Sequence, residues 1–174
     1  MKKFLSILLI SAMLLTLAPM AVFAAEATPV GTAITTAAEL HSMKDNGTYY
    51  LANDITITSE NALYATEDKE GGATQTGNGW RYRSALVGTT LDGNGKTIYY
   101  ADGLTIYAGL FSEVNGITLK NLNIVQQGNV TYKGLGGEVS ALVRRIVGGT
   151  VEITNVSAYA NIVMTSANEA NQQR

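Results

Sequence analysis

The sequence has no cysteine and only one histidine, His41. Without cysteine no disulfide can form, so a protein of this size must be held together by its core and its backbone hydrogen bonds. Zinc sites need several nitrogen or sulfur ligands, and one imidazole does not supply them. The composition therefore excludes a disulfide scaffold, and we expect neither a metal nor a cofactor.

Basic residues are scarce, and two of the 12 lysines and arginines are Lys2 and Lys3. They precede a long apolar stretch and the small residues that end at Ala24, an order typical of a secretory signal peptide. We expect cleavage after residues 1–24; an uncleaved membrane anchor is the alternative, and Pro19 argues against it. Without Lys2 and Lys3, ten basic residues face 14 acidic ones, a net charge of −4. No basic run remains, so nothing indicates a nucleic-acid partner.

The mature chain of 150 residues is long enough for one domain with a core. It begins with a small polar leader, residues 25–33, and a helical pattern follows within residues 34–47. Thr36 and Glu39 form a capping box, in which each side chain accepts a hydrogen bond from the other residue's backbone N–H. We expect His41, inside this helix, to have a surface or packing role.

From Thr48 the pattern changes to a period of two. In TYYLANDITIT (48–58) apolar residues alternate with mostly polar neighbours, which predicts a strand. Asn53 falls on the inward side of this alternation. Residues 59–80 show no period and are rich in glycine, threonine and acidic residues, so we predict a surface loop there.

One pattern occurs three times after that loop, in residues 84–98, 108–124 and 140–158. In the last two copies apolar residues alternate until an asparagine, Asn121 or Asn155, at which the alternation changes phase. Such a change means that the chain turns a corner and starts another strand facing the same interior. Repeats of about 20–50 residues built only of strands and corners indicate a solenoid with one coil per repeat.

We therefore predict an all-β solenoid with coils over residues 48–163 and a polar tail over 164–174. A tight corner leaves buried backbone groups without ladder partners, at a cost of about 1–3 kcal/mol each. Asparagine tolerates left-handed backbone and its amide both donates and accepts hydrogen bonds. We expect an inward-facing ladder of corner residues: Asn53, Asn121 and Asn155.

No cap is evident after the third copy. An open solenoid end exposes core and strand edge, which solenoids normally cover. We expect these coils to be an incomplete part of a longer solenoid.

The stretch LDGNGKT raises the question of a catalytic carboxylate, because it carries Asp92 among glycines. Glycine and asparagine accept positive φ, and aspartate side chains cap backbone groups close to them in sequence. We therefore assign Asp92 and the three residues that follow it to a turn.

Taken together, these segments resemble the right-handed parallel β-helix proteins of the pectin-lyase-like superfamily. Bacterial surface proteins with GLUG-type repeats are the most similar group. The resemblance covers residues 34–163 and is carried by TYYLANDITIT, TTLDGNGKTI, AGLFSEVNGITLKNLNI and GGTVEITNVSA. It implies a right-handed parallel β-helix in an exported, non-catalytic part of a surface protein. Such a part serves as a stalk or as an adhesive or glycan-binding face.

The same superfamily includes pectate lyases and polygalacturonases. The alternative function is therefore the N-terminal part of a polysaccharide lyase or glycoside hydrolase whose catalytic coils lie further on. The sequence lacks the N-T-D-like triplet, the G-H-G and the R-I-K of the glycosidases. Asp54, Asp92 and Asp102 are too scattered to propose the acidic calcium ligands of the lyases. We expect no catalytic residue in this chain.

Binding of a polysaccharide or cell-surface glycan outside the cell would need exposed aromatic rings, which combine a large contact area with a polar tip. Tyr99, Tyr100 and Tyr107 are weaker candidates, with a place on a solenoid face as the alternative. The best cluster in the sequence is Trp80, Arg81, Tyr82 and Arg83.

Overall fold

The computed structural model describes residues 28–65, 74–77, 79–82, 85–133 and 138–162. Four predicted features lie outside these ranges: the signal peptide (1–24), the start of the leader (25–27), Arg83 and the tail (164–174). The described chain is mostly β, and all but one of its strand pairs are parallel. This is the all-β class that the alternating patterns predict.

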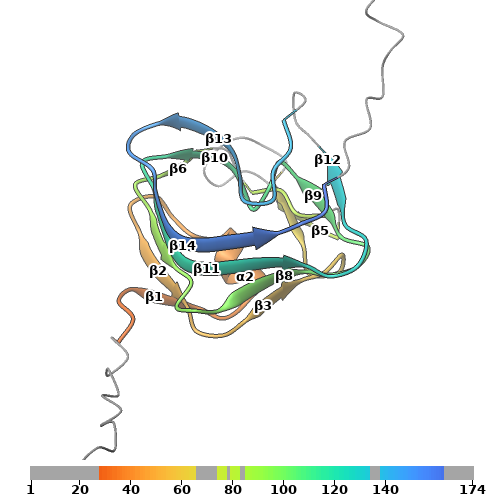
Figure 1. The fold of residues 1–174 in the computed structure, drawn as a ribbon, viewed down its shortest axis with the longest axis horizontal. Helices are drawn as coiled ribbons and strands as arrows, with labels where there is room; N and C mark the ends of the chain where they lie inside the picture. Colours follow the sequence, from red (N-terminus) through yellow and green to blue (C-terminus); the bar gives the residue numbers. More distant parts are fainter. Residues whose placement is uncertain (1–27, 66–73, 78, 83–84, 134–137, 163–174) are drawn as a thin grey trace, which may run out of the picture.

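The largest sheet contains seven parallel strands (Figure 1). β14 pairs with β11 along one edge. On the other edge of β11, the first half pairs with β7 and the second half with β8. The strands of this sheet are β1 (Thr32–Ile34), β2 (Thr48–Leu51), β3 (Ile55–Ile57), β7 (Thr90–Asp92), β8 (Thr97–Tyr100), β11 (Thr118–Gln126) and β14 (Glu152–Tyr159). The last residues assigned to the leader are thus part of the sheet, because β1 pairs with β2.

Three smaller sheets complete the fold. Two of them are parallel and one is an antiparallel hairpin. The parallel sheets are β6 (Leu86–Val87) with β10 (Phe111–Asn115) and β13 (Val143–Gly148), and β9 (Thr105–Tyr107) with β12 (Thr131–Lys133); the hairpin is β4 (Leu63–Ala65) with β5 (Thr74–Thr76).

The surface loop predicted for residues 59–80 is wrong where the structure describes it. The segment contains the antiparallel β4–β5 pair, and two parallel bridges join it to later residues, Tyr64 to Arg81 and Trp80 to Ile106. Strands of three residues are too short to display a period, which is why the pattern there predicted a loop.

The predicted helix is present as α2 (Ala37–His41), and its capping box is confirmed. The Thr36 hydroxyl accepts from the Glu39 N–H at 3.1 Å, and the Glu39 carboxylate accepts from the Thr36 N–H at 3.1 Å. Leu40 and Met43 are fully buried, so this segment covers one end of the core. His41 packs edge-on against the ring of Trp80, with 5.1 Å between centroids. Of the two roles predicted for His41, surface or packing, the structure shows packing.

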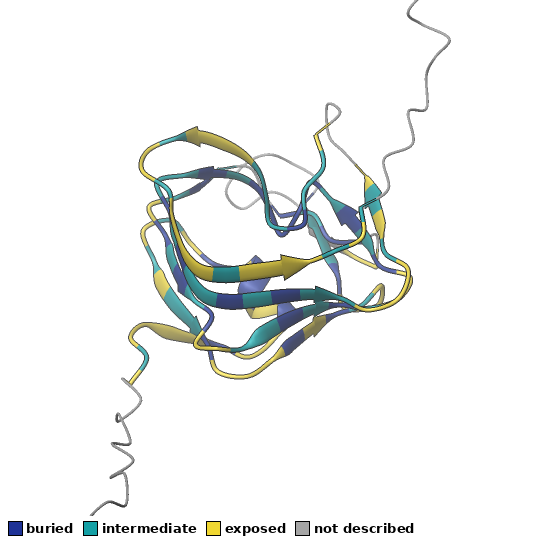
Figure 2. Ribbon diagram, in the orientation of Figure 1, coloured by how far each residue is buried: buried dark blue, intermediate teal, exposed yellow. Residues whose placement is uncertain are grey.

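The interior is built from matched inward positions on successive strands. Leu91, Leu119 and Ile153 are register partners on β7, β11 and β14. The first two are 0% and 1% exposed, but Ile153 is 50% exposed. Figure 2 shows the same change along whole strands, with β11 alternately buried and half-buried and β14 almost entirely exposed. The core is therefore covered at the α2 end and open at β14.

Candidate functional site

The cluster predicted to bind a ligand is not on the surface. Trp80 and Tyr82 are both 0% exposed. The Trp80 indole N–H donates to the Leu110 carbonyl at 2.9 Å, and the Tyr82 hydroxyl donates to the Met43 carbonyl at 3.1 Å. The prediction is wrong for these two residues, because both side chains belong to the hydrophobic core.

Arg81, between them, faces the other way and is half-buried. Its guanidinium donates to the Ala65 carbonyl at 3.1 Å and lies 5.3 Å from the centre of the Tyr64 ring. Tyr64 packs edge-on against Tyr107, whose ring lies 5.5 Å from the Lys133 amino group. Side chains of the protein itself therefore contact both rings, and this face stabilises the fold.

The other tyrosine candidates are divided between interior and surface. Tyr100 is fully buried, and its hydroxyl donates to the Ala141 carbonyl at 2.7 Å. Burial raises the pKa of Tyr100 well above its ordinary value. Tyr99 is half-buried on the outer side of β8. Neither lines the groove or the hollow described below.

The corner residues Asn121 and Asn155 lie side by side, with the Asn155 amide donating to Asn121 Oδ1 at 3.0 Å. Both have left-handed backbone, at φ 51° and 53°. The Asn121 amide in turn donates to Asp92 Oδ1 at 3.1 Å. The two asparagines form the expected pair, but they border a surface groove instead of facing the core, so the inward position predicted for them is wrong.

Asn53 is not part of this ladder. Its side chain is exposed, and its amide donates to the carbonyls of Thr35 and Asp54. The inward position predicted for Asn53 is wrong, because the chain bends at Ala52–Asp54 and does not continue the strand. Asp92 takes the third place in the ladder.

Asp92 is the last residue of β7, just before the turn at Asn94 and Gly95, so the assignment of Asp92 itself to the turn is wrong. Its carboxylate has two further partners. Oδ1 accepts from the Asn94 N–H at 2.8 Å, and Oδ2 lies 3.2 Å from the Lys120 amino group. Partial burial favours the neutral acid, but hydrogen bonds from Asn94 and Asn121, together with Lys120, outweigh it and lower the pKa of Asp92. A carboxylate held ionised in this way orders a corner and is poorly suited to donate a proton.

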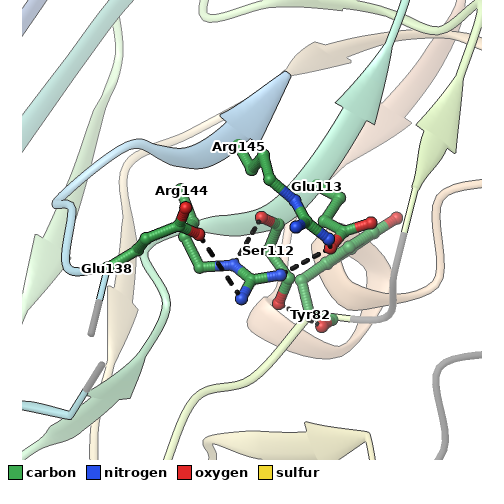
Figure 3. Close-up of polar contacts among 6 residues, drawn as sticks. All are labelled: Tyr82, Ser112, Glu113, Glu138, Arg144 and Arg145. Carbon is green, nitrogen blue, oxygen red and sulfur yellow. Dashed lines mark hydrogen bonds and ion pairs between the residues drawn. The ribbon is translucent and has the colours of Figure 1, made fainter. Parts of the chain in front are cut away.

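A second group of charges joins β10 to β13 (Figure 3). Arg144 contacts Glu113 at 2.5 Å, Arg145 contacts the same carboxylate oxygen, and Glu138 lies 3.7 Å from Arg144. The Arg144 guanidinium also donates to the Ser112 carbonyl at 3.3 Å. Because Glu113 is only 12% exposed and contacts two guanidinium groups, this network ties neighbouring strands together.

The feature best suited to bind a ligand is a surface hollow of about 580 Å³ where β11 and β14 end and β12 begins. Figure 1 shows these three strand ends close together. We call it the tyrosine hollow. Its lining residues carry amide, hydroxyl and aromatic groups and no formal charge: Gln126, Gly128, Asn129, Val130, Thr131, Tyr132, Tyr159 and Asn161. The sequence alone did not suggest this site. Most of its lining comes from the segment QQGNVTYKGLGG (126–137), which lies between the second and third copies of the repeated pattern.

Gln126 is held in a fixed orientation at the floor of the tyrosine hollow. Its Oε1 accepts from the Tyr132 hydroxyl at 3.2 Å and from the Asn161 N–H at 2.9 Å. Its amide nitrogen donates to the Gly128 carbonyl at 2.9 Å. These contacts join the end of β11 to β12 and to the residues that follow β14, so the hollow is preorganised.

The two tyrosines of the hollow differ in how far they are exposed to solvent. Tyr132 is half-buried, and burial raises its pKa to about 12, so it remains a neutral hydroxyl. Tyr159 is 75% exposed and offers a free ring face. An exposed ring beside fixed amides can bind an uncharged polar molecule, but the hollow has no group that titrates near neutral pH to drive acid–base chemistry.

Within the described ranges, no three potential metal-binding side chains come close enough to hold an ion. No helix in the same ranges has the length and apolarity needed to cross a membrane. No family model, curated protein or solved structure matches this chain.

Proposed function

We propose that this chain is a right-handed parallel β-helix segment of an exported bacterial surface protein that binds a neutral glycan in the tyrosine hollow without cleaving it. The observation that carries the binding function is the exposed Tyr159 ring beside the fixed Gln126 amide. Sugars present apolar ring faces and many hydroxyl groups, and such a surface matches both features.

The β-helix part of the proposal is supported by the parallel register. Thr90, Thr118 and Glu152 are partners on three successive strands, and Leu86, Val114 and Ile146 are partners on a second sheet. Strands from the same three repeat copies therefore stack in the same order on two faces, as one coil per repeat requires.

A neutral ligand is favoured over an acidic one by the charge of the hollow. None of the lining side chains is basic, so the carboxylates of a polyuronate would find no guanidinium or ammonium partner there. An uncharged polysaccharide, by contrast, needs only the ring, the amides and the hydroxyl groups.

Export is supported by the N-terminal pattern of a basic head, an apolar stretch and small residues ending at Ala24. N-terminal sequencing of secreted protein is expected to start at Ala25 or Glu26. An intact Met1 on the mature protein would contradict export with cleavage.

The binding test is calorimetric titration of the protein with neutral and acidic polysaccharides. Tyr159→Ala should weaken binding of the neutral ligand about tenfold, because the stacking surface is lost. Tyr50→Ala is the matched control, since Tyr50 is half-buried on β2 and does not line the hollow. Equal affinities for Tyr159→Ala and the unchanged protein would contradict this site, and depolymerisation of polygalacturonate that disappears in Asp92→Ala would contradict the non-catalytic function.

A further inference from the structure

The outer face of the large sheet carries one row of register partners that includes two tyrosines. Val125 on β11 pairs with Tyr99 of β8 on one edge and with Tyr159 of β14 on the other. Tyr99 in turn pairs with Thr56 of β3. Register partners in a parallel sheet direct their side chains to the same face, so these four residues form what we call the outer row. In Figure 1 their strands, β14, β11, β8 and β3, lie one below another.

The outer row faces solvent and not the core. Three residues next to it in sequence, Ile98, Tyr100 and Ile124, are all 0% exposed. Because side chains alternate along a strand, Tyr99 and Val125 point the other way, out of the sheet. Any strand added after β14 would hydrogen-bond to its edge, so it would lengthen the row and leave this face open.

The tyrosines of the outer row differ from those of the interior in the partners of their hydroxyl groups. The hydroxyl groups of Tyr82, Tyr100 and Tyr132 donate to oxygen atoms of the protein itself. Those of Tyr99 and Tyr159 have no hydrogen-bond partner among the described residues. Each of these two tyrosines therefore presents an apolar ring and an unused polar tip, a combination that suits a sugar.

The positions beside the outer row are polar and uncharged. Asn123 on β11 and Ser157 on β14 are register partners, and the Ser157 hydroxyl donates to Asn123 Oδ1 at 2.7 Å. The four residues of the outer row carry no charge either. Rings, an amide and hydroxyl groups without a formal charge match the apolar faces and hydroxyl groups of a neutral sugar chain.

We propose that the polysaccharide held in the tyrosine hollow continues along the outer row as an extended chain, with Tyr99 as a second stacking position, an inference that rests on the function proposed above. Tyr159 lines the hollow and belongs to the row, so the two surfaces are continuous. Tyr99 and Tyr159 lie on strands two spacings apart, about 9.5 Å, close to the length of a disaccharide. Side chains at equal strand spacings favour a ribbon-like chain such as a β-linked glucan. The ligand is thus a linear polymer that is bound along its interior.

The test is calorimetric titration of the purified full-length protein with two neutral probes, cellobiose and cellohexaose. Cellohexaose is long enough to reach both surfaces, so it should bind about tenfold more tightly than cellobiose. Tyr99→Thr should weaken cellohexaose binding about tenfold and should act much less on cellobiose, which is too short to occupy the hollow and Tyr99 together. Threonine is favoured in strands, so the change suits β8.

Two further variants complete the design. Val125→Lys places a charged side chain between the two rings and should also weaken cellohexaose binding, so the result does not depend on one variant folding. Tyr50→Thr is the matched control, because Tyr50 is a half-buried strand residue on β2 that pairs with Asp92, outside the outer row. Its affinity for cellohexaose should equal that of the unchanged protein.

The proposal is overturned if Tyr99→Thr and Val125→Lys both bind cellohexaose as tightly as the unchanged protein does. It is equally overturned if cellohexaose binds no more tightly than cellobiose, or if neither probe binds. Loss of affinity in Tyr159→Ala alone would support the hollow without the outer row, whereas equal affinities in all these variants would contradict both.

Discussion

At the scale of single residues, the corner at Asn121 depends on two properties of one side chain. Its backbone is left-handed, at φ 51°, and its amide joins Asn155 to Asp92. Alanine disfavours left-handed backbone and has no amide to form these hydrogen bonds. We therefore expect Asn121→Ala to lower the free energy of unfolding by about 2 kcal/mol. Asn121→Gly tolerates the left-handed backbone but removes the amide, so it should lower the free energy of unfolding by about half as much. Urea unfolding of both variants measures the difference.

The control for this prediction is Asn53→Ala. Asn53 is exposed and does not have a positive φ, so its replacement should cost less than that of Asn121. Equal losses for Asn121→Gly and Asn121→Ala would show that backbone strain plays no part at this corner.

The carboxylate of Asp92 makes the stability of the protein depend on pH. Its folded pKa lies below the usual value of 3.8, so the ionised form stabilises the fold. This contribution is complete above about pH 4 and is lost as the pH falls through the lowered folded pKa. The pKa of Glu39 is lowered too, chiefly by the hydrogen bond from the Thr35 backbone N–H, so acid should act at both sites.

We expect Asp92→Asn to reduce the loss of stability on acidification without abolishing it. Thermal unfolding between about pH 3 and pH 7 should show a smaller fall in the midpoint for the variant than for the unchanged protein. Glu39→Gln is the companion control. It should also reduce the acid-induced fall in the unfolding midpoint, by the part that comes from Glu39. Parallel curves for Asp92→Asn and the unchanged protein would contradict the role of Asp92.

At the scale of elements, the segment around Trp80 joins the hairpin to the core. Trp80→Ala should lower the free energy of unfolding by about 3–5 kcal/mol, because it empties a fully buried site. Trp80→Phe fills most of the volume but leaves the Leu110 carbonyl without its donor, at a cost of about 1–3 kcal/mol. Chemical unfolding followed by circular dichroism distinguishes these variants. If Trp80 were instead a binding residue on the surface, neither variant would change the free energy of unfolding.

At the scale of the whole molecule, the burial of a side chain depends on whether another strand or helix covers it as much as on the residue type. The inward position occupied by Leu91, Leu119 and Ile153 is apolar in all three strands, yet only the last is half exposed. The helix that covers the first end has no counterpart among the described residues at β14. The two ends of one repeated structure therefore differ in what they can bind.

The sequence by itself determined the features that depend on near neighbours or on repeated spacing. The capping box of Thr36 and Glu39 needs only a separation of three residues. The matched corners Asn121 and Asn155 follow from two copies of one alternating pattern, and the turn after Asp92 follows from local glycine and asparagine. Such patterns specify which face of a strand a residue occupies.

Only the tertiary structure decided which segments lie side by side. It buried Trp80 and Tyr82, gave Asp92 the place expected for Asn53, and brought Gln126 and Tyr159 together in a hollow. The insertions at residues 59–80 and 126–137 interrupt the period, so spacing along the chain does not reveal their partners. Because contacts between neighbouring parallel strands join residues about 30 positions apart, they depend on the length of every intervening turn, which no local pattern records.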